Sequence, residues 1–151
     1  MKILTKGVGR YTIGIWIALV AILLTMLAWI MQIYSLIDWE GAISLGIQNE
    51  SFSGDQVEQT LANVERGIAL ADIFWALPLT IIALIGVLRK RLIGFIAGMM
   101  DFAISVYFPL FFAFQRWDSH GDVVLAALML FALPSLLGIL GLWTNRKLFI
   151  Q

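Results

Sequence analysis

Four long apolar stretches decide what this chain can fold into. They cover roughly residues 11–36, 69–88, 92–114 and 123–144. A helix of about 20 apolar residues, rising 1.5 Å per residue, is long enough to cross the hydrocarbon core of a bilayer. The sequence therefore predicts an all-α membrane protein. We expect residues 1–151 to form a single transmembrane domain, an antiparallel four-helix transmembrane bundle.

The composition agrees with a membrane protein and excludes several other classes. The chain is 61% hydrophobic and 13% charged, with a mean hydropathy of +0.93. Ten Lys and Arg balance ten Asp and Glu, so the basic surface of a nucleic-acid binder is missing and we expect no nucleic-acid partner. The absence of cysteine excludes disulfides, thiolate metal sites and thiol nucleophiles. A single histidine excludes a haem held between two imidazoles, and we expect neither metal nor cofactor.

The basic residues predict how the chain is oriented. Eight of the ten would lie on one side of a four-span chain: Lys2, Lys6, Arg10, Arg89, Lys90, Arg91, Arg146 and Lys147. Because Lys and Arg near transmembrane helices stay in the cytoplasm, both termini are expected there. The first apolar stretch is too long for a signal peptide, and no small-x-small cleavage site follows it. We therefore expect a multi-pass protein of a plasma membrane or a bacterial inner membrane.

Residues 37–68 form the only sizeable segment that is expected outside the membrane. Ser53 and Gln56 have the spacing of a capping box, which predicts a helix from about Gly54 that continues through the second span. An apolar stripe with helical spacing follows: Val57, Leu61, Val64 and Ile68. We expect this stripe to be covered by residues 43–47, by the outer turn between spans three and four, or by another protein.

The first half of this outer segment is harder to interpret. Ile43, Leu45 and Ile47 alternate with polar or small residues, which fits a short strand or an interfacial segment equally well. Asn49 begins the formal glycosylation sequon Asn49-Glu50-Ser51, but its use depends on the source of the protein.

Every span carries a line of small or polar residues. In the third span the line is Gly94, Gly98, Asp101 and Ser105, and in the fourth it includes Gly138 and Gly141. Lipid gives apolar side chains no reason to leave it, so membrane helices associate through small residues and shared hydrogen bonds. The four lines predict a compact bundle. The Gly94-x-x-x-Gly98 spacing favours contact with a helix of the same chain over contact with a second subunit.

Asp101 is the most informative polar residue in the sequence. It lies about ten residues deep, as do Pro78 and Pro134, and is therefore near the bilayer centre. A charged Asp costs about 2.5–3.5 kcal/mol there, so we expect Asp101 to face the bundle and to carry a proton. Its carboxyl group either binds and releases a proton or cation, or donates a structural hydrogen bond to a carbonyl freed by one of the prolines.

Two further groups are candidates for chemistry. Asp72 lies nearer the outer side, level with Ser105, and could extend Asp101 into an ion-binding path; alternatively it reaches interfacial water or pairs with Arg66. His120 lies between Asp118 and Asp122 in the outer turn, where two acids would favour its charged form and make it sensitive to pH. The same residues also suit a simple polar turn, and one imidazole is too little for a zinc site.

Three functions remain open. No phosphate loop or nucleophile elbow is present, so no catalytic residue is assigned. The interpretation we favour is an accessory, assembly or sensing protein that acts on another membrane protein or on a second copy of itself, because nothing in the chain requires turnover. The alternatives are a proton- or cation-coupled transporter or channel that uses Asp101 and Asp72, and an intramembrane lipid-modifying enzyme with Asp101 as its acid.

The predicted orientation is testable because the chain contains no cysteine. Single cysteines introduced as Ser53→Cys and Lys147→Cys are expected to react with a membrane-impermeant thiol reagent from opposite sides of a sealed membrane. The cysteine-free parent is the control for background labelling. Labelling of both variants from the same side would contradict a four-span chain.

Overall fold

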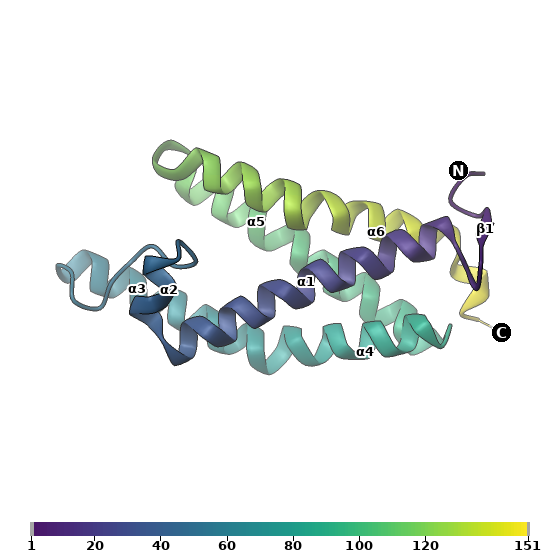
Figure 1. Ribbon diagram of the computed structural model, residues 1–151, viewed down its shortest axis with the longest axis horizontal. Helices are drawn as coiled ribbons and strands as arrows, with labels where there is room; N and C mark the ends of the chain where they lie inside the picture. Colours follow the sequence, from purple (N-terminus) through teal and green to yellow (C-terminus); the bar gives the residue numbers. More distant parts are fainter. Residues whose placement is uncertain (1, 151) are drawn as a thin grey trace. The chain divides into compact units, whose positions relative to one another are not determined.

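The computed structural model describes residues 2–150, except for the side chains of Ser119 and His120 (Figure 1). About 80% of the chain is helical, which confirms the all-α class. Four helical stretches of the described chain are long and apolar enough to span a membrane: Ile13–Ile37, Gln56–Leu88, Leu92–Asp118 and Gly121–Thr144. The chain thus has the helices of a multi-pass membrane protein.

The chain divides into two compact units, which are described separately. The first contains the residues up to Thr25 and those from Leu79 onward; the second is Met26–Pro78. The first unit holds the start of α1 (Ile13–Ile37), most of α4 (Leu77–Leu88), α5 (Leu92–Ala127), η2 (Leu128–Ala132), α6 (Leu133–Thr144) and the short η3 (Arg146–Leu148). The second holds the rest of α1, α2 (Trp39–Ser44), α3 (Gln56–Ala71) and η1 (Asp72–Ala76).

A small hairpin that the sequence analysis did not predict precedes α1. Strand β1 (Gly7–Val8) pairs antiparallel with β2 (Tyr11–Thr12), and Gly9 turns the chain between them with φ +61°. Glycine adopts this left-handed conformation without steric cost. The Tyr11 hydroxyl donates to the Leu88 carbonyl at 3.0 Å and thereby ties the hairpin to the end of α4. Figure 1 shows the hairpin beside the C-terminal segment.

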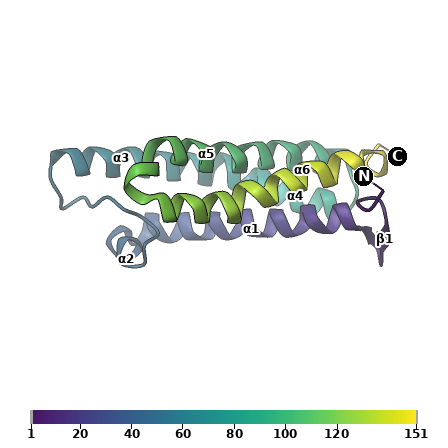
Figure 2. The same ribbon diagram turned by 90° about the horizontal axis from the view of Figure 1, so that it is seen from above.

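The first unit has its core between α1, α4, α5 and α6. Helix α5 packs against η2 and α6, and its ribbon folds back on itself in Figure 2. Helix α5 includes the turn between the third and fourth spanning stretches, which run over Leu92–Asp118 and Gly121–Thr144, so the third stretch continues a few residues past its expected end near residue 114. Gln115 and Arg116 are good helix formers, and they extend the helix even though they are polar.

Both π-helical segments end directly before a Leu-Pro pair. Segment η1 is followed by Leu77-Pro78, and η2 is followed by Leu133-Pro134. Proline has no N–H group and clashes with the carbonyl one turn earlier. A π-turn has one more residue than an α-turn. It makes room for the proline ring and lets the freed carbonyl find another donor, so it relieves both the clash and the missing hydrogen bond. Each π-turn also rotates the side chains that follow it.

The second unit begins, after α1, with a short helix where a strand or an interfacial segment was expected. Asp38 caps α2, because its side chain accepts a hydrogen bond from the Gly41 N–H at 2.9 Å. Gly46, with φ +70°, follows the helix. The Trp39 ring is buried, and its Nε1–H donates to the Glu50 carbonyl at 2.8 Å. The alternation at residues 43–47 therefore reflects the end of a capped helix and its turn.

Helix α3 begins two residues later than expected and has a different cap. Asp55 Oδ1 accepts from the backbone N–H groups of Val57 and Glu58, both at 2.9 Å. The expected cap, Ser53, is instead hydrogen-bonded to Ser51 at 2.7 Å, so that prediction is wrong. Asp55 lies directly before the first turn of α3, so its negative charge interacts favourably with the helix dipole in addition to accepting the capping hydrogen bonds.

The buried face of α3 is also not the apolar stripe. Ala62 and Ala69 are buried, whereas Val57 is 68% exposed and Val64 is 54% exposed. The expectation that the chain covers the stripe is wrong for these two valines. Small side chains allow closer packing than valine, so the alanine line turns inward.

The cap can be tested by removing one polar side chain at a time. Asp55→Ala is expected to lower the stability of α3 by about 1 kcal/mol and to speed amide exchange in its first turn, because two N–H groups lose their acceptor. Ser53→Ala is the matched control and should change exchange there very little. Equal effects of the two substitutions would mean that Asp55 is not the cap.

Candidate functional site

Asp101 lies in the interior of the first unit. Its side chain is on α5 and is 0% exposed. The Thr80 hydroxyl on α4, which is equally buried, donates a hydrogen bond to Asp101 Oδ1. The other carboxyl oxygen, Oδ2, is buried and has no hydrogen-bond partner among the described residues. A carboxyl group is thus held at the contact between two apolar helices.

A second hydrogen-bonded pair lies one turn further along α5. The Ser105 and Thr25 hydroxyls are 3.2 Å apart and join α5 to α1. The Thr25 hydroxyl also donates to the Ala21 carbonyl at 3.1 Å, which uses its only proton. Ser105 is therefore the donor between the two hydroxyls, and both side chains are buried.

Ser135 on α6 is a further buried polar residue of the first unit. It is 1% exposed, and its hydroxyl has no hydrogen-bond partner among the described residues. Leaving a buried hydroxyl or carboxyl oxygen unsatisfied costs about 1–3 kcal/mol. Ser135 Oγ and Asp101 Oδ2 are thus both buried polar atoms without a hydrogen-bond partner among the described residues.

Glycines bring the helices together around these polar groups. A methyl group built on Gly94 of α5 would collide with the backbone of Gly86 and Val87 on α4. One built on Gly98 would lie 2.8 Å from Leu142, and one on Gly138 would lie 2.6 Å from the Phe102 ring. The Gly94-x-x-x-Gly98 pair therefore contacts helices of the same chain.

The same kind of contact joins α1 to α6. A methyl group on Gly141 would collide with the Gly14 carbonyl, and one on Gly14 would lie 2.6 Å from Asn145 Nδ2. Lines of glycine and small residues on four helices thus leave no room for side chains at their crossings. This arrangement packs Asp101 and Ser105 against neighbouring backbone and apolar side chains.

The other predicted residues lie elsewhere. Asp72 is the first residue of η1 in the second unit, where it is half-buried; its Oδ2 has no hydrogen-bond partner among the described residues. Asp118 and Asp122 are exposed on α5. The His120 side chain lies outside the described residues, so the pH-sensitive turn stays a prediction. In the described part of the chain, no three His, Cys, Asp or Glu side chains are grouped to hold a metal ion.

Thr80, the residue that donates to Asp101, is not among the residues predicted from the sequence. In the second span, regular helical spacing places Asp72, Ala76, Leu79, Ala83 and Gly86 on one line of small or polar residues. Ala76, Ala83 and Gly86 are buried as this line predicts, but Thr80 is fully buried in place of Leu79, which is half-buried. The available signal is the spacing of Thr80, since it lies four residues after Ala76 and three before Ala83 and so shares their face of the helix.

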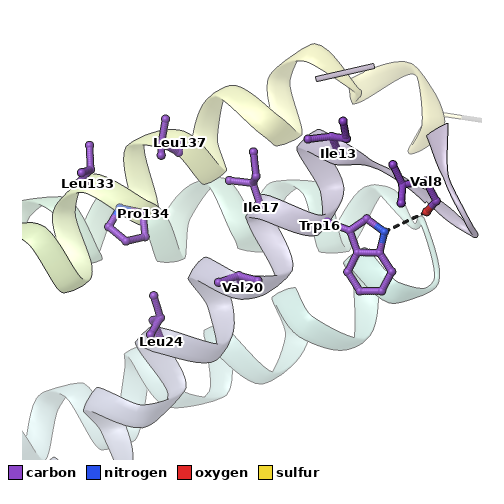
Figure 3. Close-up of a pocket in the computed structure, with 9 residues that line it drawn as sticks. All are labelled: Val8, Ile13, Trp16, Ile17, Val20, Leu24, Leu133, Pro134 and Leu137. Carbon is purple, nitrogen blue, oxygen red and sulfur yellow. Dashed lines mark hydrogen bonds between the residues drawn. The ribbon is translucent and has the colours of Figure 1, made fainter. Parts of the chain in front are cut away.

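An apolar groove lies between the hairpin, α1 and α6 (Figure 3). Its volume is about 570 Å³, and its walls include Val8, Trp16, Leu24, Pro134 and Leu137. The Trp16 Nε1–H donates to the Val8 carbonyl at 3.0 Å and fixes one wall. No titratable side chain lines the groove, and Asp101 is not among its lining residues. The groove therefore suits apolar groups such as lipid chains.

The chain matches no protein-family model, and comparison with curated proteins and with solved structures found no match. Its function has to be argued from the buried Asp101–Thr80 pair and from the helices that enclose it.

The glycine contacts can be tested with one added methyl group. Gly94→Ala is expected to destabilise the protein by about 1–3 kcal/mol, because α4 and α5 must move apart. Gly67→Ala in α3 is the matched control, since its methyl group meets open space, and it should stabilise its helix by up to about 1 kcal/mol. Thermal unfolding in one detergent measures both. A Gly94→Ala protein as stable as the parent would show that the two helices do not touch there.

Proposed function

We propose that this chain is a small four-span integral membrane protein of the accessory, assembly or sensing type. Both termini lie in the cytoplasm, the helices of its bundle are antiparallel, and the protein acts through its outer segment. Asp101 is a structural group that joins two helices. The observation that carries the proposal is the complete burial of Asp101 together with its hydrogen bond from Thr80.

The packing around Asp101 supports a structural role. Its neighbours on α5, Gly98 one turn earlier and Phe102 next in the chain, are in close contact with α6, Gly98 with Leu142 and Phe102 with Gly138. A carboxyl group that moves protons or ions needs a path for water or for the ion. Apolar contacts on either side of Asp101 favour a filled bundle in which the carboxyl group serves as a hydrogen-bonding link.

The outer part of the chain supports an accessory role. Val57 and Val64 are exposed on one line of α3, two turns apart, and the half-buried Leu61 lies between them. In the proposed topology this line faces water outside the membrane. Exposed apolar side chains that share a helix face are typical of a surface that binds another protein.

A second candidate is a proton- or cation-coupled transporter or channel. Asp101 Oδ2 and Ser135 Oγ are the observation that favours it, because both are buried without a partner among the described residues. A proton on the carboxyl group, or a small cation beside it, would satisfy such atoms. Asp72, the other acid predicted for this candidate, also has a buried Oδ2 without a partner among the described residues, within the second unit.

Two substitutions at Asp101 separate these candidates. Asp101→Asn keeps the size and the hydrogen-bonding capacity and should leave the melting temperature almost unchanged. Asp101→Leu removes the acceptor of Thr80 and should cost about 1–2 kcal/mol. In sealed liposomes that hold a pH- or Na⁺-sensitive dye, the parent protein is expected to give no more flux than protein-free liposomes.

The opposite pattern would contradict the structural role. A proton or cation flux in the parent, lost in a folded Asp101→Asn variant, would favour the transporter. Infrared spectroscopy provides an independent readout, since a neutral carboxylic acid shows a C=O band that disappears in the Asn variant.

A further inference from the structure

We infer that the first unit is an internal duplication, in which the helix pair α1–α4 is repeated as α5–α6, and that Ala21 and Ser135 occupy the second copy of the Asp101–Thr80 site. The repeat is visible in the small and polar residues. Gly14, Ala18, Ala21 and Thr25 of α1 have the same spacing as Gly94, Gly98, Asp101 and Ser105 of α5, with Thr25 and Ser105 80 residues apart. Thr80, Ala83 and Gly86 of α4 have the spacing of Ser135, Gly138 and Gly141 of α6.

The burial of individual residues repeats in the same register. From Val20 to Thr25 and from Met100 to Ser105, buried, half-buried and exposed positions follow in identical order. The same is true along all of Leu79–Leu88 and Pro134–Trp143. An Ala-Leu-Pro sequence that begins with the last residue of a π-turn stands at the start of both segments; Pro78 directly precedes the first segment, and Pro134 is the first residue of the second.

The contacts between helices repeat as well. Gly94 of α5 meets the backbone of Gly86 on α4, and the corresponding Gly14 of α1 meets the backbone of Gly141 on α6. If α1 is exchanged with α5 and α4 with α6, the Gly94–Gly86 contact becomes the Gly14–Gly141 contact, and the reverse. The same exchange carries Thr25 onto Ser105 and Ser105 onto Thr25, so their hydrogen bond lies on the pseudo-twofold axis that relates the two helix pairs. A stripe of small residues on each helix would arise from packing alone, but packing alone does not require matched crossings and matched hydroxyls.

The duplication explains the unpartnered hydroxyl of Ser135. Exchanging the halves carries Thr80 onto Ser135 and Asp101 onto Ala21. In the first site a hydroxyl donates to a carboxyl oxygen; in the second the hydroxyl is kept, but the acid is replaced by a methyl group. Ser135 thus marks a carboxylate-binding position. The outer segment between α1 and α4 has no counterpart between α5 and α6, so it is an addition to the repeated pair.

The inference is tested by placing an acid at the second site. Ala21→Asp is expected to fold and to be clearly more stable than Ala18→Asp, the matched control, since Ala18 is equally buried but has no hydroxyl in the corresponding position. Removing the hydroxyl with Ser135→Ala should raise the unfolding constant about threefold more in the Ala21→Asp background than in the parent, as one membrane hydrogen bond would. The double variant Asp101→Ala with Ala21→Asp moves the acid from the first site to the second. It should recover part of the stability that is lost with Asp101→Ala alone.

The inference is wrong if Ala21→Asp is as damaging as Ala18→Asp, or if Ser135→Ala has the same effect in both backgrounds. A second measurement does not depend on a buried acid. In the cysteine-free chain, Ile22→Cys with Ala83→Cys and Phe102→Cys with Gly138→Cys occupy equivalent positions. A short thiol cross-linker should join both pairs to a similar extent, while Val20→Cys with Ala83→Cys, whose first member is exposed, should not be joined. Cross-linking of only one equivalent pair would also overturn the duplication.

Discussion

The close approach of glycine backbones is the constraint on which the first unit depends. At the contacts of Gly86 with Gly94 and of Gly14 with Gly141, even a methyl group would collide with the opposite helix. Helices in lipid gain little from burying apolar side chains against each other, so contact between backbones and shared hydrogen bonds must hold them. Only at such short separations can a side chain as small as Thr80 reach the carboxyl group of Asp101. The polar interior therefore follows from the glycine crossings.

The sequence was sufficient for the class and for part of the candidate site. The four apolar stretches predicted the all-α class, which is confirmed, because helices that span a bilayer must be long and apolar. Asp101 stood out for the same reason, since a lone acid in an apolar span has to turn inward. Thr80 did not stand out, because Leu79 and Thr80 both lie near the small-residue face of α4 and only the contact with α5 decides which of them is buried. Asp55 and Ser53 are both good caps, and only the path of the chain decides between them.

Contacts between residues that are far apart in the sequence could not be predicted from it, as the surroundings of Asn145 in the first unit show. Asn145 follows α6 and donates through Nδ2 to the carbonyls of Gly141 and Leu4, while its Oδ1 accepts from the Thr12 hydroxyl at 2.8 Å. One side chain thereby satisfies a carbonyl at the C-terminal end of α6 and fastens the segment before α1. Two of these partners, Leu4 and Thr12, are far from Asn145 in sequence. Spacing and propensity report on neighbours along the chain, so neither the hairpin nor its attachment left a readable pattern.

A duplicated bundle with one carboxyl group also bears on the choice between functions. Two acids at matching positions would double the cost of removing carboxyl groups from water, at a depth where each is expensive even when neutral. A structural link needs only one such group, because glycine contacts already hold both crossings and the Asp101–Thr80 hydrogen bond adds to the first one alone. A coupling site built on a twofold repeat has more to gain from keeping both acids at the interface between the halves, where transporters with internal repeats bind their ions. The replacement of the second acid by Ala21, with Ser135 retained, is therefore easier to reconcile with Asp101 as a link between helices than with a pair of ion-binding sites.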